Sequence, residues 1–331
     1  MPCFNAATTL DEALNSLVTQ SFLDFEIIAV NDGSSDSTPM ILSDWALKDR
    51  RIKVLDQPHH GILVALNTGI QACAGPYIAR MDADDRCHPK RLEHQFSFLE
   101  SHPEVAVVGC LVAGFPDNEV RRGFQIYLTW LNSLVSDTDI RREIFIESPL
   151  AHPSVMMRKD WLVKVGGYLE KGWPEDYDLW LRLYLAGARF SKIPEVLLYW
   201  REFPQRLTRS DSRYSLENFL RAKAYYLAKG PLLNCEAVII WGAGMTGRRL
   251  SKHLMREGVS LAAFVDIDPK KIGGTLRNLP VLAPEDLPNW LNQYAEPKVL
   301  AAVGARGARQ LIRQRLNVIG LQEGQNWWGV A

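Results

Sequence analysis

Residues 26–36, Glu-Ile-Ile-Ala-Val-Asn-Asp-Gly-Ser-Ser-Asp, place an apolar run directly before an acidic turn that contains Asp32. Residues 76–85, Pro-Tyr-Ile-Ala-Arg-Met-Asp-Ala-Asp-Asp, repeat this arrangement and end in a turn with Asp82 and Asp84. Because parallel strands deliver the residues that follow them to one edge of a sheet, we expect these carboxylates to share an edge. Such oxygens suit a hard divalent cation and the polyphosphate that it neutralises. The two turns therefore predict chemistry on a nucleotide-activated substrate.

The pattern around these turns alternates between helical and strand periods. The alternation predicts a mostly parallel sheet with helices on both faces. Residues 115–148 follow neither period clearly, and we expect them to cap the sheet. The expected helices are 10–20, 38–48, 62–72, 89–101, 176–186 and 211–229, and the expected strands are 25–30, 52–55, 77–81 and 105–110.

Composition narrows the class of protein. The chain has 331 residues with 38 basic and 38 acidic side chains, so it has no positive excess for a nucleic-acid partner. No apolar run reaches the roughly 18 residues that a transmembrane helix needs. Peripheral contact with a membrane does not require such a run and stays an open alternative. The 5 cysteines show no disulfide or metal-binding spacing, as expected for reduced thiols in a cytoplasmic protein.

Four ordered motifs resemble those of the family 2 glycosyltransferases, which have the GT-A fold. They are Pro-Cys-Phe-Asn at 2–5, Asn-Asp-Gly-Ser-Ser-Asp at 31–36, Met-Asp-Ala-Asp-Asp at 81–85 and Glu-Asp-Tyr-Asp-Leu-Trp at 175–180. The resemblance implies an inverting transfer of a sugar from a nucleotide-sugar donor, most often a UDP-sugar. The acceptor would be a hydroxyl of a glycan or a lipid-linked saccharide.

The resemblance also implies which residues contact the nucleotide sugar. Asp32 matches the acid that hydrogen-bonds the base, although an Asx turn or a helix cap would explain the same residue. The other implied contacts are Pro2, Phe4 and Asn5 at the nucleobase, Gly61 and Asn67 near the nucleotide, and His152 near the donor or acceptor.

Asp82 and Asp84 match the family's D-x-D motif, which implies that they hold Mg²⁺ or Mn²⁺ against the diphosphate. A nucleoside diphosphate gains negative charge as it leaves, and a divalent cation stabilises that charge. Carboxylate oxygens are the hard ligands that these cations prefer. We expect the neighbouring Asp85 to support this shell or to cap the next helix.

Asp176 matches the family's general base, which takes the proton of the attacking hydroxyl. Glu175 is the close competitor for this role, whereas Asp178 should point elsewhere from the same helix. An alternative is that all three acids only complement the positive end of the helix dipole.

The chain departs from the family pattern in two places. The strand that usually precedes Pro2 is absent, so we expect an open core there and a natural start upstream of Met1. Phe203 stands near the place where many relatives carry a metal-binding histidine. Water or Glu202 is expected to complete the metal shell instead.

A second α/β pattern begins at residue 235. Gly242, Gly244 and Gly247 follow a strand and open a helix, and Asp266 ends the next strand. This is the dinucleotide fingerprint in its expected context, but it forms only half of a full dinucleotide fold. The segment resembles small Rossmann-like domains of sugar-modifying enzymes. Two interpretations stay open, a nucleotide site and a module that packs its glycine turn against the first domain.

The sequence therefore predicts an α/β chain with a GT-A nucleotide-sugar-binding domain at 1–205, a helical linker at 206–234 and a Rossmann-like domain at 235–331. The leading hypothesis is a glycosyltransferase. Two others are a catalytically silent nucleotide-sugar-binding module and a dinucleotide-dependent oxidoreductase, which would use the second domain alone.

Overall fold

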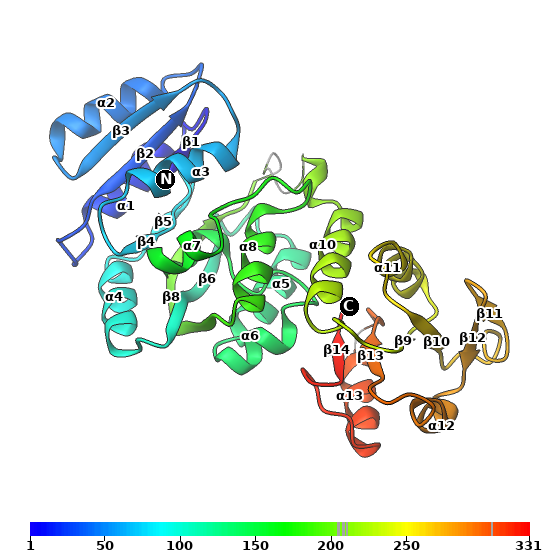
Figure 1. The fold of residues 1–331 in the computed structure, drawn as a ribbon. Coiled ribbons are helices and arrows are strands. Elements are labelled where there is room, and N and C mark those ends of the chain that lie inside the picture. The colour runs from blue at the N-terminus through cyan, green and yellow to red at the C-terminus, as the bar shows by residue number, and fades with distance from the viewer. Residues whose placement is uncertain (204–205, 207–208, 210, 306) are drawn as a thin grey trace. The chain divides into compact units, whose positions relative to one another are not determined.

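The computed structural model describes residues 1–203, 206, 209, 211–305 and 307–331, so part of the predicted linker at 206–234 lies outside the described residues. The chain forms two compact units of α/β structure (Figure 1). Unit 1 comprises residues 1–140, 149–171 and 175–210, and unit 2 comprises residues 141–148, 172–174 and 211–331. The α/β fold class is confirmed. The functional division at residues 205 and 235 stays a prediction.

The predicted helices and strands of the N-terminal part are present. The helices at 38–48 and 62–72 have the predicted bounds. The elements are β1 (Pro2–Cys3), α1 (Leu10–Val18), β2 (Ile27–Asp32), α2 (Thr38–Lys48), β3 (Ile52–Gln57), α3 (Ile62–Ala72), β4 (Tyr77–Ala79), β5 (Arg86–Cys87), α4 (Arg91–Ser101), β6 (Val105–Phe115), α5 (Arg122–Ser133), α6 (Asp137–Glu143), η1 (His152–Ser154), β7 (Met156–Arg158), α7 (Lys159–Lys164), α8 (Glu175–Leu185) and β8 (Arg189–Arg201).

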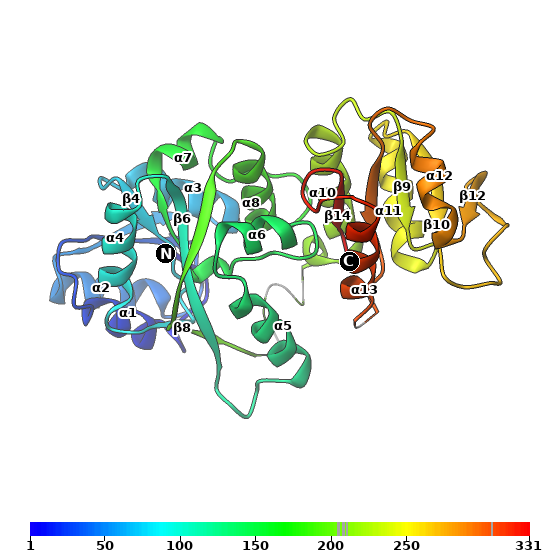
Figure 2. The ribbon, with the colours of Figure 1, turned by 90° about the horizontal axis from the view of Figure 1, so that it is seen from below.

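Unit 1 contains two sheets. The three-stranded sheet has the order β1-β2-β3 and is parallel, as the sequence predicts. The five-stranded sheet has the order β4-β7-β6-β8-β5 and is mixed, because β7 runs antiparallel to β4 and β6, and β5 runs antiparallel to β8. Its two long strands, β6 and β8, are parallel and lie side by side (Figure 2).

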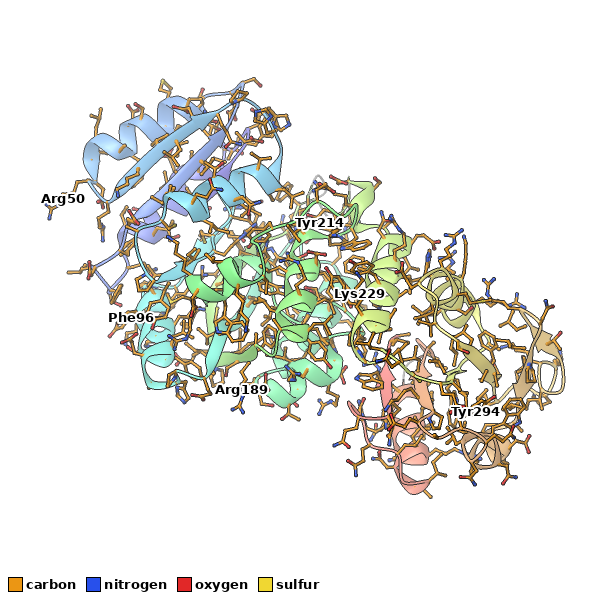
Figure 3. All side chains as sticks on the ribbon, viewed as in Figure 1. Arg50, Phe96, Arg189, Tyr214, Lys229 and Tyr294 are labelled. Carbon is orange, nitrogen blue, oxygen red and sulfur yellow. The ribbon has the colours of Figure 1, made fainter. Side chains whose placement is uncertain are left out.

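A cavity of about 590 Å³ lies beside the two-residue strand β1. Its lining includes Pro2, Ile28 of β2, Tyr77 of β4 and Phe96 of α4. Phe96, labelled in Figure 3, stands edge-on to Tyr77 with 5.6 Å between the ring centroids. The buried amino group of Met1 donates to the Ile28 carbonyl at 2.8 Å. This cavity lies where the sequence analysis expects an open core, and the two sheets stay separate among the described residues.

Unit 2 is built on one six-stranded sheet with the order β11-β12-β10-β9-β13-β14. All neighbours from β12 to β14 pair in parallel, and β11 is antiparallel. The prediction of half a dinucleotide fold is wrong, because β13 and β14 continue the sheet beyond β9. The elements are η2 (Ser212–Tyr214), α10 (Leu216–Lys229), β9 (Val238–Trp241), α11 (Met245–Arg256), β10 (Leu261–Val265), β11 (Thr275–Leu276), β12 (Leu279–Leu282), η3 (Pro284–Asp286), α12 (Leu287–Leu291), β13 (Lys298–Ala301), α13 (Ala308–Val318) and β14 (Trp327–Gly329).

Helix α10 anchors the outlying segments of unit 2. The ammonium of Lys223 is buried and donates to the carbonyls of Ile146 at 2.7 Å and Val330 at 3.1 Å. Trp173 packs against Tyr225, with 5.4 Å between the ring centroids. These contacts explain why residues 141–148 and 172–174 belong to this unit. Among the described residues, no helix combines the length and the apolarity that crossing a membrane requires.

Candidate active site

The second acidic turn follows β4 and gathers three carboxylates. Asp82, Asp84 and Asp85 each offer an oxygen, and these oxygens lie within 4.8 Å of one another. Asp85 is only 1% exposed, and its Oδ1 accepts from the Arg201 amide at 2.8 Å. Its buried Oδ2 has no hydrogen-bond partner within the described part of the chain. The turn therefore holds buried acceptor capacity that the protein leaves unused.

The charges at this turn are only partly compensated. Burial and the neighbouring Asp82 raise the pKa of Asp84 to about 6. Burial and the charge of Asp84 likewise raise the pKa of Asp85. The buried guanidinium of Arg80 pairs with Asp82. Because three hard-oxygen donors face one another with excess negative charge, these residues fit a divalent cation.

Two side chains from elsewhere in unit 1 fix the backbone of the acidic turn. Thr9, just before α1, donates its hydroxyl to the Ala83 carbonyl at 3.0 Å. Arg201, at the end of β8, donates from Nε to the Asp84 carbonyl at 2.6 Å. Its guanidinium also lies 4.4 Å from the centroid of the Phe115 ring. The turn is thereby held from both sides, and sequence reasoning missed this role of Arg201.

Glu202 lies next to Arg201 but does not join the acidic group. Its buried carboxylate accepts from Arg206 at 2.9 Å and also pairs with Arg209. The third carboxylate of the acidic group is therefore Asp85, and not Glu202 as the sequence suggested. The two adjacent acids at 84–85 were the sequence signal that could have identified Asp85 as this third carboxylate.

The first turn of α8 presents the predicted base. Asp176 is half-buried, and its Oδ1 accepts from the Tyr177 amide at 2.7 Å. Glu175 is buried, which makes it the less accessible of the two candidates. Asp178 is fully buried and accepts from Arg182 at 2.7 Å, so the prediction that Asp178 points elsewhere is confirmed.

A buried phenol electrostatically links the two acidic motifs. Burial raises the pKa of Tyr168, Arg80 opposes this rise, and the charges of Glu175, Asp176 and Asp82 add to it. All of these groups therefore act on one side chain. Charges from the D-x-D turn and from the start of α8 thus both reach Tyr168, a residue to which sequence reasoning gave no role.

His152 completes this buried group. Its Nε2 lies 2.6 Å from the Tyr168 hydroxyl, and its ring stands edge-on to Trp180 at 6.0 Å between centroids. Burial, followed by the charge of Arg80, lowers the pKa of His152 well below its usual value. The imidazole is therefore neutral and positions Tyr168, and its role toward donor or acceptor stays a prediction.

The buried carboxylate of Asp32 is already occupied by protein donors. Its Oδ1 accepts from the Gln57 amide at 2.6 Å and the His60 backbone at 3.0 Å. Its Oδ2 accepts from the Gly61 backbone at 2.9 Å and lies 2.8 Å from the His59 ring nitrogen. A carboxylate has about four acceptor positions. Asp32 and Gly61 therefore fix the turn before α3, and a base contact by Asp32 stays a prediction.

The segment after β1 forms the opposite wall of this turn. Asn5 has a left-handed backbone with φ 49°. Its amide donates to the Ser34 hydroxyl at 3.0 Å, and its Oδ1 accepts from Ser35 at 2.9 Å. Phe4 is 47% exposed and stacks on His59 at 4.1 Å between centroids. An exposed aromatic face lies here, where the sequence predicts the nucleobase.

Asn67 has a clear structural partner. Its Nδ2 donates to the Tyr168 carbonyl at 2.8 Å, and its Oδ1 accepts from the Tyr168 amide at 2.9 Å. A Cβ on Gly167 would lie 2.7 Å from the same Oδ1. Asn67 therefore positions the backbone of Tyr168, and direct contact with the nucleotide stays a prediction.

The second-unit residues also meet at one place. Gly242, Gly244 and Asp266 line a single cavity. Gly247 lies within the first turn of α11, directly against the Gly242 carbonyl.

The fold of unit 1 and its acidic turns define a sugar-transferring enzyme of the GT-A class. The sequence model of the family described as "Glycosyl transferase family 2" matches residues 1–166 of this chain. The chain is 35% identical over 190 residues to the amylovoran biosynthesis glycosyltransferase AmsE of Erwinia amylovora, covering 57% of this chain and 69% of the relative. It is 32% identical over 223 residues to the putative glycosyltransferase EpsE of Bacillus subtilis, covering 66% of this chain and 77% of the relative.

Solved structures agree with this fold. The structure of S. aureus TarS 1-349 in complex with UDP-GlcNAc has a TM-score of 0.58 and 19% sequence identity, covering 88% of this chain and 77% of that chain. At this identity the likeness shows the fold alone.

The chain belongs to glycosyl transferase family 2. It is a glycosyltransferase that moves a sugar from a donor to an acceptor, and inversion and metal dependence are typical of its family.

Proposed function

We propose that this chain transfers a sugar from a nucleoside-diphosphate sugar, with a UDP-sugar favoured, to a hydroxyl of a glycan or a lipid-linked saccharide in the cytoplasm. The relatives support such an acceptor, since one is named for amylovoran biosynthesis and another for O-antigen biosynthesis. The observation that carries the proposal is the group of three aspartates within 4.8 Å at the end of β4.

In this proposal Asp84 and Asp82 hold Mg²⁺ or Mn²⁺, and Asp85 supports them from the buried side. The cation supplies the positive charge that stabilises the leaving diphosphate. Arg201 keeps the turn in place through the Asp84 carbonyl and the Asp85 carboxylate. Arg80 pairs with Asp82 and so limits how far that carboxylate can turn.

Asp176 acts as the general base from the first turn of α8, with Glu175 as the alternative. Half-burial gives Asp176 both access to an acceptor hydroxyl and an environment poorer in water than the surface. The base takes the hydroxyl proton while the hydroxyl oxygen attacks the anomeric carbon, and the C1–O bond to the diphosphate breaks. The Tyr168 hydroxyl lies 2.6 Å from the neutral His152 ring, and the charges of Asp176 and Asp82 both raise the pKa of Tyr168.

The nucleoside half of the donor would lie against the β1–α1 and β2–α2 turns. Phe4 offers an exposed ring face, and Asn5 holds its loop against Ser34 and Ser35. Pro2, Gly61 and Asn67 are proposed as further contacts of the nucleotide. In this arrangement Asp32 acts mainly by fixing the loop that carries His59, since protein donors surround its carboxylate.

A catalytically silent nucleotide-sugar-binding module is the second candidate. It would share the metal and the donor but would not need a base on α8. The accessible carboxylate of Asp176 favours transfer over binding alone.

A donor-turnover assay separates these candidates. We would measure release of the nucleoside diphosphate from a panel of UDP- and GDP-sugars with Mn²⁺, with and without lipid-linked saccharide acceptors. The proposal predicts turnover that is lost in Asp176→Asn and in Asp84→Asn but kept in the exposed control Asp44→Asn. Donor binding without turnover by the unaltered protein would favour the silent module.

A further inference from the structure

Unit 2 contains a cavity that sugar transfer in unit 1 does not use. The cavity has a volume of about 530 Å³ and is lined by residues that follow β9, β10 and β13. Strand β10 lies on one side of β9 and β13 on the other, so the strand order reverses at this point. Ligands of open parallel sheets bind at such reversals, beyond the carboxyl ends of the strands. The volume lies within the range of small-molecule sites.

The glycines around this cavity fall into two groups. Gly242 has φ +120°, and a Cβ there would lie 2.9 Å from the Ala302 carbonyl oxygen. A Cβ on Gly247 would lie 1.8 Å from the Gly242 carbonyl oxygen. The fold itself therefore requires both glycines, and they say nothing about a ligand.

Gly244 and Gly304 have no such explanation. Gly244 has φ −82°, which any residue can adopt, and a Cβ there would meet nothing within 4 Å. A Cβ on Gly304 would also meet nothing within 4 Å, and both glycines line the cavity. Their missing side chains leave the cavity open without helping the fold.

The polar wall of the cavity combines a helix start with a carboxylate. Helix α11 begins at Met245 directly after Gly244, and the first backbone N–H groups of a helix have no acceptors within it. Asp266 is buried and accepts from the Ala243 amide at 2.9 Å, the Lys271 ammonium at 3.0 Å and the Asp268 amide at 3.0 Å. A carboxylate has about four acceptor positions, so one remains for a ligand hydroxyl.

The mouth of the cavity is apolar. Met245, Ile267 and Leu311 all line it and are 64%, 74% and 68% exposed. Large aliphatic side chains with this exposure suit the flat face of a ring. The cavity thus offers amide donors for an anion, a carboxylate for hydroxyls and an aliphatic rim for a base.

We propose that unit 2 binds a nucleoside diphosphate group without a metal ion. The diphosphate lies over Gly244 at the start of α11, the ribose hydroxyls donate to Asp266, and the base packs on Ile267 and Leu311. ADP, NAD⁺ and UDP-sugars share this group. The site is separate from the acidic turn of unit 1, so it stands or falls independently of the proposed transfer.

The test is calorimetric titration of the full chain with ADP, NAD⁺, UDP and UDP-GlcNAc in EDTA. Hydrogen exchange of the peptide that spans residues 242–250 localises any binding. The key variant is Gly244→Val, because the backbone and the space around Gly244 accept a side chain. The matched control is Gly123→Val, since Gly123 is exposed and also has nothing within 4 Å of a Cβ.

We expect at least one of these nucleotides to bind and to protect residues 242–250. Gly244→Val should weaken this binding about tenfold or more, with the melting temperature unchanged. Gly244→Ala should give a smaller loss, and Gly123→Val none. If none of the four nucleotides binds in EDTA, or if Gly244→Val binds as tightly as the unaltered chain, the proposal is overturned.

Discussion

We propose that the turn after β4 in unit 1 and the turn after β9 in unit 2 both bind a diphosphate, but with groups of opposite charge. Each follows a short apolar strand of a sheet. The first presents Asp82, Asp84 and Asp85, so it can meet a diphosphate only through a cation. The second presents Gly242 and Gly244 at a helix start, where in our proposal backbone N–H groups bind the diphosphate directly.

This difference has an energetic consequence. Burial and the charge of Asp82 raise the pKa of Asp84, and either a proton or a bound cation relieves this unfavourable burial of negative charge. The glycine turn stores no such repulsion, because Lys271 and two backbone amides already compensate Asp266. In our proposals, therefore, the first turn serves metal-dependent catalysis and the second serves binding alone.

The largest expected effect comes from removing the base that only unit 1 needs. Asp176→Asn should lower the rate of sugar transfer by about 10²–10⁴-fold, since the amide cannot accept the hydroxyl proton. Donor turnover is the measurement, and binding of nucleotide in EDTA by unit 2 should not change.

Glu175→Gln is the control for this experiment. Because Glu175 is buried, its substitution should cost less than that of Asp176. A larger loss in Glu175→Gln than in Asp176→Asn would transfer the role of base to Glu175.

The next largest effect is expected from removal of the metal ion, which only the acidic turn of unit 1 should need. Treatment with EDTA should lower sugar transfer by about a hundredfold or more, because the leaving diphosphate loses its counter-charge. Added Mn²⁺ should restore the rate in the unaltered protein but not in Asp84→Asn. Transfer that persists in EDTA would mean that the acidic turn works without a cation.

A third prediction concerns stability and pH. The pKa of Asp84 is raised in the folded protein to about 6, so this carboxyl binds more protons in the folded chain than in the unfolded chain between about pH 4 and pH 6. The contribution of Asp84 to the stability of the metal-free protein therefore falls as pH rises through this window. Asp84→Asn should raise the melting temperature by a few degrees (about 2–5 °C) at pH 7.5 and change it little at pH 4.

The exposed Asp44→Asn serves as its control and should leave the melting temperature unchanged at both pH values. An Asp84→Asn protein that melts below the unaltered chain at pH 7.5 in EDTA would contradict the repulsion that distinguishes the two turns.

The smallest expected effect comes from the two hydrogen bonds between Asn67 and the Tyr168 backbone. Asn67→Ala removes both hydrogen bonds to the Tyr168 backbone and should lower the free energy of unfolding by about 1–3 kcal/mol. Chemical denaturation measures this loss. Asn15→Ala is a matched helical control with an exposed side chain, and an equal effect in both variants would show that the Tyr168 contact contributes nothing.

Much of the fold could be predicted from hydrophobic period alone. The helices at 38–48 and 62–72 were predicted with correct bounds because clear turn residues flank an amphipathic pattern. Strand β8 at Arg189–Arg201 was missed, since charged residues and Pro194 interrupt its alternation and its partner β6 lies far away in sequence. The return of β7 as an antiparallel strand likewise depends on tertiary pairing that no local pattern records.

The candidate site shows the same limit. The acids at 82, 84 and 176 stand out as motifs, whereas Arg201 and Tyr168 act through backbone and long-range contacts that the sequence does not display. Asp32 shows the opposite case. Its motif suggested a ligand contact, but four protein donors surround its carboxylate.

The central claim is that the acidic turn holds a diphosphate through a cation while the glycine turn holds one without it. Hydrogen exchange of the full chain with UDP-GlcNAc and with the nucleotide that unit 2 binds in the titration, each measured with Mn²⁺ and again with EDTA, tests this claim. We predict that UDP-GlcNAc protects residues 81–87 only with Mn²⁺ and that the nucleotide bound by unit 2 protects residues 242–250 in both conditions. Protection of residues 81–87 that is the same in EDTA would contradict the claim.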